Sequence, residues 1–192
     1  CRENGIRLIS DEIYQGISFG DVRECTALEF GDDAIIINSF SKYFSMTGWR
    51  LGWAVVPPDL MRAVECLQQN LFISAPALSQ IAAVAAFDCE DELQANVAAY
   101  ARNREILLNE LPKAGFGNFA PADGAFYLYA DVRDLTDDSE AFCRRMLDET
   151  GVATTPGTDF DRLRGKHYVR FSFAHSEATM LGAVKALKNW QR

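Results

Sequence analysis

Short apolar runs broken by turn residues predict three strands in the first third of the chain. Residues 6–10 form the first run and lead into Asp11. Residues 34–38 form a β-branched run, which is typical of a strand buried on both faces in a parallel sheet covered by helices. Residues 50–56 form a third strand that ends at Pro57. Because a parallel crossover needs about a dozen residues or more, the short loop before this strand predicts antiparallel pairing.

Helical periodicity begins after these strands. Apolar residues recur at helical spacing from Leu60 to Leu71, with Asp59 as the expected N-cap. A second helix is expected at residues 77–87. A third carries apolar residues from Leu93 to Leu111, which is long enough to link two domains.

The remaining residues alternate between strands and helices, which is typical of a small α+β domain. The expected strands are residues 125–132, 152–155 and 168–174, and the expected helices are residues 139–150 and one opening at Ser176. In the last strand, alternation places Tyr168, Arg170 and Ser172 on one face. We expect one domain to end near residue 92 and a linking helix with a small C-terminal domain to occupy residues 93–192.

Composition narrows the classes of function. The chain has 192 residues and a formal net charge of -8, and no basic patch offsets that acidity, so we do not expect a nucleic-acid partner. Its five cysteines form no CxxC pair, which favours free thiols in a reducing cytoplasm and no metal site. No segment has the length and apolarity of a membrane span. The chain begins without methionine and almost directly with a strand pattern, so we expect it to be the later part of a longer protein.

Lys42 is the first candidate for chemistry. It follows an apolar strand and is surrounded by Ser39, Ser41 and Arg50. A lysine here could hold an aldehyde cofactor through an imine, while the hydroxyls and the guanidinium hold the cofactor's phosphate. Each feature alone has an ordinary alternative, because most lysines at strand ends are solvated.

Three other residues fit the same chemistry. Asp11, at the end of the first strand, could keep a pyridinium nitrogen protonated and so make the ring an electron sink. Tyr14 could donate a hydrogen bond to a phenolic oxygen of that ring. Arg170 could bind a carboxylate with two hydrogen bonds. The alternatives are a turn residue for Asp11 and a surface ion pair for Arg170.

Together these motifs resemble the fold-type I aminotransferases, more narrowly the class I/II branch. The resemblance rests on residues 10–14 (SDEIY), 39–42 (SFSK), 46–53 (MTGWRLGW), 124–127 (GAFY), 156–160 (PGTDF) and 169–174 (VRFSFA). It implies a doubly wound, mostly parallel α/β large domain, of which residues 1–92 are the C-terminal part, followed by the small α+β domain. It also implies a homodimer with pyridoxal 5'-phosphate as cofactor.

The same resemblance implies a role for each candidate. Lys42 is the Schiff-base lysine, Asp11 the partner of the pyridine nitrogen and Tyr14 the partner of the phenolic oxygen. Ser39, Ser41 and Arg50 are the phosphate ligands, and Arg170 holds the substrate α-carboxylate. The expected substrates are an L-amino acid and a 2-oxo acid.

Two alternatives to transamination remain open. A C–S β-lyase of the same fold uses much the same residues on a substrate with a leaving group. The chain by itself is alternatively a catalytically incomplete fragment, because the family's N-terminal half supplies other parts of the cofactor pocket. In that case we expect little turnover and a poorly covered sheet around residues 34–38.

Overall fold

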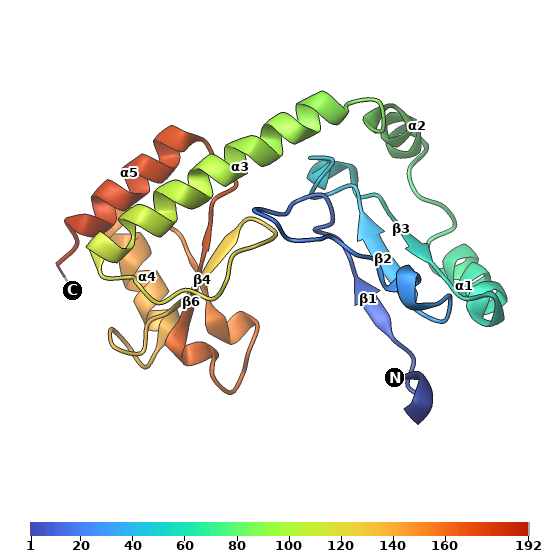
Figure 1. The fold of residues 1–192 in the computed structure, drawn as a ribbon, viewed down its shortest axis with the longest axis horizontal. Coiled ribbons are helices and arrows are strands. Elements are labelled where there is room, and N and C mark those ends of the chain that lie inside the picture. The colour runs from blue at the N-terminus through green and yellow to red at the C-terminus, as the bar shows by residue number, and fades with distance from the viewer. Residues whose placement is uncertain (192) are drawn as a thin grey trace. The chain divides into compact units, whose positions relative to one another are not determined.

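The computed structural model describes residues 1–191, which form two compact units. Unit 1 comprises Cys1–Ala95 and unit 2 comprises Asn96–Arg192. The longest helix, α3 (Glu90–Glu110), runs through the boundary (Figure 1). The domain boundary expected near residue 92 falls within this helix as well.

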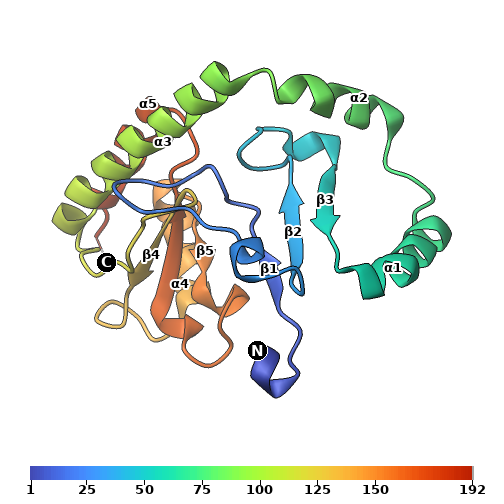
Figure 2. The same ribbon diagram turned by 45° about the vertical axis from the view of Figure 1, so that its right-hand side comes forward.

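A three-stranded sheet organises unit 1. Its strands are β1 (Ile9–Asp11), β2 (Ile35–Ser39) and β3 (Gly52–Val55), in the order β1-β2-β3. β1 and β2 are parallel, with Asp11 paired to Ile37. β2 and β3 are antiparallel, as predicted, and their arrows point in opposite directions in Figure 2. Gly52 permits this tight pairing, because a Cβ there would lie 2.6 Å from the carbonyl oxygen of Asn38.

Two further helices follow β3 in unit 1, namely α1 (Pro58–Leu71) and α2 (Ala77–Ala86). The expected N-cap at Asp59 is wrong. Proline is favoured in the first helical position, so Pro58 starts the helix and Pro57 takes the N-cap position without a side-chain hydrogen bond. The Asp59 carboxylate instead accepts a hydrogen bond from Arg7 Nη2 at 2.6 Å.

Unit 1 has a small core and leaves part of its sheet uncovered. Phe40 and Met46 of the β2–β3 loop form a buried cluster with Ala83 of α2. In β2, Ile36 is 3% exposed whereas Ile37 is 40% exposed. β2 is therefore covered on one face only. The prediction that this strand is buried on both faces is wrong within this chain, and the expectation of a poorly covered sheet around residues 34–38 is confirmed.

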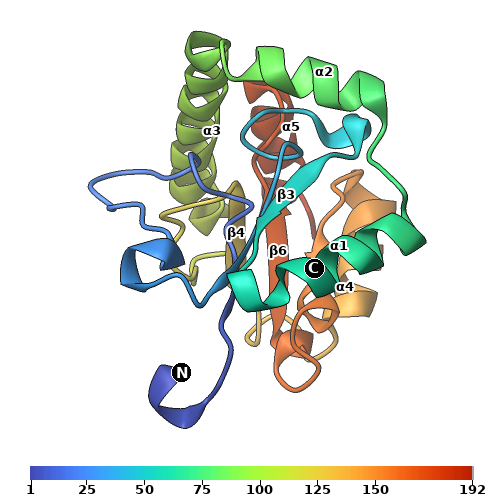
Figure 3. The ribbon, with the colours of Figure 1, turned by 90° about the vertical axis from the view of Figure 1, so that its right-hand side faces the viewer.

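Unit 2 is an antiparallel sheet with helices on one face (Figures 1 and 3). Its strands are β4 (Tyr127–Asp131), β5 (Thr155–Pro156) and β6 (Tyr168–Ser172), in the order β4-β6-β5. The helices are α4 (Ser139–Thr150), α5 (Glu177–Lys188) and most of α3. The predicted α+β pattern is confirmed here.

The core of unit 2 is continuous and apolar. On β6, Val169 and Phe171 are buried and face the helices, while Arg170 is half-buried on the other face, as the alternation predicted. Asp138 caps α4 by accepting the N–H groups of Glu140 and Ala141, and Ser176 caps α5. Among residues 1–191, no helix combines the length and the apolarity needed to cross a membrane.

Candidate active site

Four of the predicted residues lie at one edge of the unit 1 sheet. Asp11 ends β1 and Ser39 ends the parallel neighbour β2, so both mark the carboxyl edge of this strand pair. Tyr14 and Lys42 follow in the two loops that leave this edge. In open α/β sheets, ligands bind beyond the carboxyl ends of the strands, so the position suits a cofactor site.

The structure brings Lys42 and Tyr14 together. Lys42 Nζ lies 5.7 Å from the centre of the Tyr14 ring, within the range of a cation–π contact. The lysine is half-buried and so is the tyrosine. An amine and a phenol side by side fit the aldehyde and the neighbouring phenolic oxygen of a pyridoxal ring.

The loop that carries Lys42 is held by its own hydrogen bonds. Ser39 Oγ donates to the carbonyl oxygen of Leu51 at 3.1 Å and accepts the N–H of Ser41 at 3.0 Å. Thr47 Oγ1 donates to the carbonyl oxygen of Ser41 at 2.7 Å. The predicted phosphate ligands Ser39 and Ser41 are thus adjacent, and Ser39 also closes the base of the loop.

Two residues of this loop have strained backbones. Ser45 has φ 56° and Arg50 has φ 52°, both in the left-handed region. Such conformations cost non-glycine residues about 1–3 kcal/mol and cluster at functional sites. Arg50 is exposed and donates from Nη1 to the carbonyl oxygen of Thr47 at 2.9 Å. A guanidinium has five N–H donors, and this bond uses one of them.

Asp11 and its neighbour Glu12 have different surroundings. The exposed Asp11 carboxylate accepts the N–H of Ile13 at 3.2 Å. Glu12 Oε1 accepts from Ser10 Oγ, Thr26 Oγ1 and the N–H of Ala27, at 3.0, 3.1 and 2.8 Å. Glu12 therefore fastens the segment around Thr26, whereas Asp11 has the more open position for a pyridine nitrogen. The sequence predicted Asp11 for this role and gave Glu12 none.

Arg170 belongs to unit 2, whereas the residues described above belong to unit 1. Its guanidinium carbon lies 4.1 Å from the centre of the Tyr127 ring and 4.3 Å from that of the Phe160 ring. Its Nη2 donates to Thr155 Oγ1 at 3.4 Å. Arg170 thus has an aromatic setting, and Phe160, which forms part of it, was not among the predicted site residues. The sequence signal for it was the PGTDF segment that ends at Phe160.

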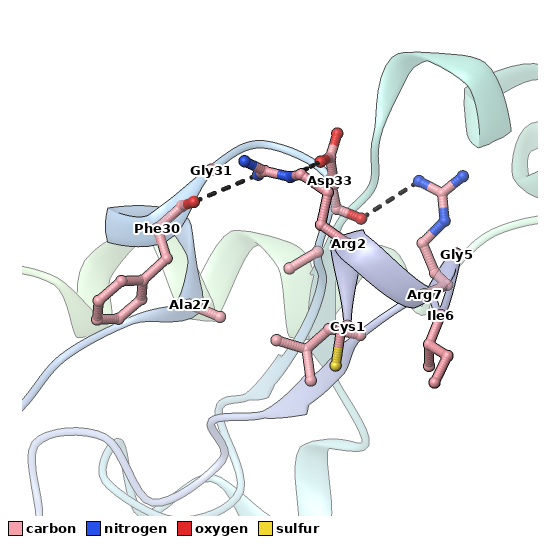
Figure 4. Close-up of a pocket in the computed structure, with 11 residues that line it drawn as sticks. Cys1, Arg2, Gly5, Ile6, Arg7, Ala27, Phe30, Gly31 and Asp33 are labelled. Atoms are coloured by element: carbon pink, nitrogen blue, oxygen red, sulfur yellow. Dashed lines mark hydrogen bonds and ion pairs between the residues drawn. The ribbon is translucent and has the colours of Figure 1, made fainter.

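A pocket in unit 1 lies away from this edge. It has a volume of about 520 Å³ and lies between the N-terminal residues, from Cys1 to Leu8, and the segment from Ala27 to Ala34 (Figure 4). Arg2 Nε donates to Asp33 Oδ2 at 2.9 Å beside it, and Phe30 lines its wall. None of the predicted site residues line this pocket, so its size does not identify it as the reaction site.

The side chains at the carboxyl edge fit a pyridoxal cofactor by their chemistry. They offer an amine for an aldehyde, a carboxylate for a pyridinium nitrogen, and a phenol for a phenolate. Hydroxyl and guanidinium donors of the same loop suit a phosphate dianion.

Known proteins give an independent view of the chain. The family model for class I and II aminotransferases matches residues 1–187. The valine–pyruvate aminotransferase of Mycobacterium tuberculosis is 49% identical, over 99% of this chain and 50% of its own length. The (5-formylfuran-3-yl)methyl phosphate transaminase of Methanocaldococcus jannaschii is 36% identical, over 98% of this chain and 50% of its own length.

Solved structures agree with this relationship. The crystal structure of an aminotransferase from Mycobacterium tuberculosis superposes with a TM-score of 0.96 at 48% identity, covering 99% of this chain and 50% of that one. The chain thus spans about half the length of the relatives it matches. It belongs to the class I and II aminotransferases, fold-type I enzymes that use pyridoxal 5'-phosphate.

Proposed function

We propose that this chain supplies the reactive lysine of an aminotransferase that moves an amino group between an L-amino acid and a 2-oxo acid. The observation that carries the proposal is Lys42 Nζ beside the Tyr14 ring, at the sheet edge where Asp11 ends β1. Family membership supports it independently. Bound pyridoxal phosphate would supply an aldehyde to carry the amino group and a ring to accept electrons.

Each side chain then has a distinct task. Lys42 Nζ would hold the cofactor at its aldehyde, and the same amine would move a proton to or from the substrate α-carbon. Asp11 would keep the ring nitrogen protonated, and Tyr14 would donate to the phenolic oxygen. Ser39, Ser41 and Arg50 would hold the phosphate, and Arg170 would hold the substrate carboxylate.

Transamination is favoured over C–S β-elimination by the names of the relatives, which describe transaminases. L-valine and pyruvate are the first pair to test, because they name the 49% identical relative. We also propose that a cytoplasmic homodimer and an N-terminal half complete the site, since the relatives are about twice as long as the matched region. The 192-residue chain alone should then turn over poorly, and robust transamination by it would contradict this.

The decisive test addresses Lys42. Pyridoxal phosphate is added to the purified chain, the absorption band of the lysine-bound cofactor is recorded, and borohydride reduction followed by peptide mass spectrometry locates the modified residue. We expect the label on Lys42 and no band in Lys42→Ala. Lys185→Ala removes an exposed lysine of α5 and is the matched control. A band that survives in Lys42→Ala would refute the assignment.

A further inference from the structure

Phe160 combines exposure with a specific contact. Its side chain is 54% exposed, which is unusual for a phenylalanine that has a fixed position. The ring centre nevertheless lies 4.3 Å from the guanidinium carbon of Arg170, while Tyr127 contributes a second ring at 4.1 Å. Arg170 is therefore flanked by two aromatic rings, one from the sheet and one from a loop.

The loop that carries Phe160 is firmly built. Asp161 Oδ1 accepts the N–H groups of Leu163 and Arg164 at 2.9 and 3.0 Å, and its other oxygen accepts from Arg164 Nε at 3.0 Å. These hydrogen bonds lower the pKa of the Asp161 carboxyl, and the bonds from the backbone N–H groups have the larger effect. The N–H of Gly165 closes the loop on the carbonyl oxygen of Asp161 at 2.8 Å.

The base of the loop is anchored to the core of unit 2. The buried residues Gly157 and Gly165 approach so closely that a Cβ on Gly165 would overlap the Gly157 carbonyl. The fully buried Ser139 donates from Oγ to the carbonyl oxygen of Gly165 at 3.0 Å. A rigid loop thus presents an exposed ring to one arginine, and packing of the core does not require that ring.

The contact has a consequence for ligand binding. An aromatic ring over a guanidinium covers its face and leaves the N–H donors in the plane of the group. A carboxylate is planar and pairs with two in-plane N–H donors. A ring that fixes the plane of the guanidinium therefore favours a carboxylate that approaches edge-on. It also reduces the competition from water for the N–H donors.

We propose that Phe160 is a positioning residue that orients the Arg170 guanidinium for a substrate carboxylate. The inference rests on the proposed role of Arg170 as the carboxylate ligand. It goes beyond that role by assigning recognition to the loop Gly157–Gly165 as well as to the arginine. Phe160 acts through Arg170 and carries out no chemical step.

The test follows the Arg170 side chain directly. In the ¹⁵N-labelled chain, the Nε–H resonance of Arg170 is recorded by NMR while pyruvate is added as the carboxylate probe. We expect that resonance to be displaced by the neighbouring rings and to shift on titration. Phe160→Leu should move the resonance and weaken pyruvate binding about five- to tenfold, as expected for loss of a partly desolvated cation–π contact.

Control variants separate the possible failures. Phe160→Tyr keeps the ring and should bind pyruvate as the parent chain does. Leu163→Ala, an 87% exposed residue of the same loop, should have no effect. If the Arg170 resonance ignores pyruvate in the parent chain, the proposed carboxylate role and this inference both fail. If it responds equally in the parent and in Phe160→Leu, only the inference fails.

Discussion

The two units of this chain differ in how far each builds its own core. In unit 2, helices α3, α4 and α5 cover one face of the sheet, and residues such as Phe116, Leu128 and Val169 are fully buried. In unit 1, every residue of β3 is exposed, and helix α1 has no buried residue. The unit that carries Lys42 thus depends on further covering, whereas the unit that carries Arg170 is self-contained.

This difference bears on the two halves of the proposed reaction. The aromatic setting of Arg170 is held by contacts within unit 2, so carboxylate recognition is testable in the chain itself. The edge that bears Lys42 belongs to a sheet with apolar surface still open, and open surface of that kind marks an interaction site. Cofactor binding is therefore the step more sensitive to missing partners.

The largest expected effect comes from the core of unit 2. Phe116 is fully buried, with ring centres 5.2 Å from Phe171 and 6.3 Å from Phe142. Phe116→Ala should cost about 3–5 kcal/mol of unfolding free energy, because it leaves a cavity. Ile37→Ala in unit 1 should cost about 1 kcal/mol or less, since that side chain is 40% exposed.

Hydrogen exchange resolved by peptide measures the two units separately. We expect Phe116→Ala to reduce protection across β4 and β6 and to leave β1 and β2 unchanged. Equal losses from the two substitutions would mean that the units do not differ in the completeness of their cores.

Local patterns account for what the sequence predicted well. The residues of α4 and the alternation along β6 follow from side-chain periodicity, and the antiparallel β3 follows from loop length. Contacts between distant segments account for what was missed. Pro58 starts α1, so Asp59 is not its N-cap. The PGTDF segment was noticed in the sequence, but it does not indicate that Phe160 contacts Arg170, which is ten residues later in the chain.

The next effect concerns the anchor of the Phe160 loop. Gly165→Ala places a Cβ against the backbone of Gly157, which cannot move cheaply, and overpacking of this kind costs about 1–3 kcal/mol. We expect unit 2 to be destabilised and the Arg170 Nε–H resonance to move toward its position in Phe160→Leu.

Gly182→Ala provides the matched control for the same unit. Gly182 lies in α5, and a Cβ there would have no neighbouring atom within 4 Å, so alanine should stabilise the helix by up to about 1 kcal/mol. A loss of unfolding free energy in Gly165→Ala with a gain in Gly182→Ala would support the role of Gly165 in anchoring the loop. A change of the same sign in both variants would contradict it.

A smaller loss of stability is expected in unit 1, where the backbone of Gly16 lies close to the Tyr43 ring. Gly16 has φ 89°, and a Cβ there would lie 2.6 Å from the Tyr43 ring, next in sequence to Lys42. Gly16→Ala should cost about 2 kcal/mol, partly from backbone strain and partly from displacing the ring. Gly20→Ala has the strain at φ 73° without any neighbouring atom within 4 Å, and should cost about 1 kcal/mol.

Pyridoxal phosphate binding separates these two glycines further. We expect Gly16→Ala to weaken pyridoxal phosphate binding, because displacing Tyr43 also moves the loop of Lys42. Gly20→Ala should leave the binding unchanged. The absorption band of the bound cofactor reports both. Equal affinities in the two variants would show that the Tyr43 contact does not position the lysine.

The smallest effect is a dependence on pH in unit 2. Glu110 accepts from Lys113 Nζ at 2.6 Å and from Lys188, and these bonds lower the pKa of its carboxyl from 4.5 to about 2. A depressed folded-state pKa means that the unfolded chain binds the proton more readily. The stabilisation is therefore complete above about pH 4.5 and is lost as the pH falls toward 2. Residue 110 cannot titrate in Glu110→Gln, so the unfolding free energy of that variant should fall less steeply across this pH range. The difference should be modest, because Glu110 and its lysine partners are solvated.

Denaturant unfolding of unit 2 at several pH values, followed by hydrogen exchange in α3 and α5, measures how the unfolding free energy depends on pH. Equal pH dependence in the parent chain and in Glu110→Gln would exclude Glu110 as the source.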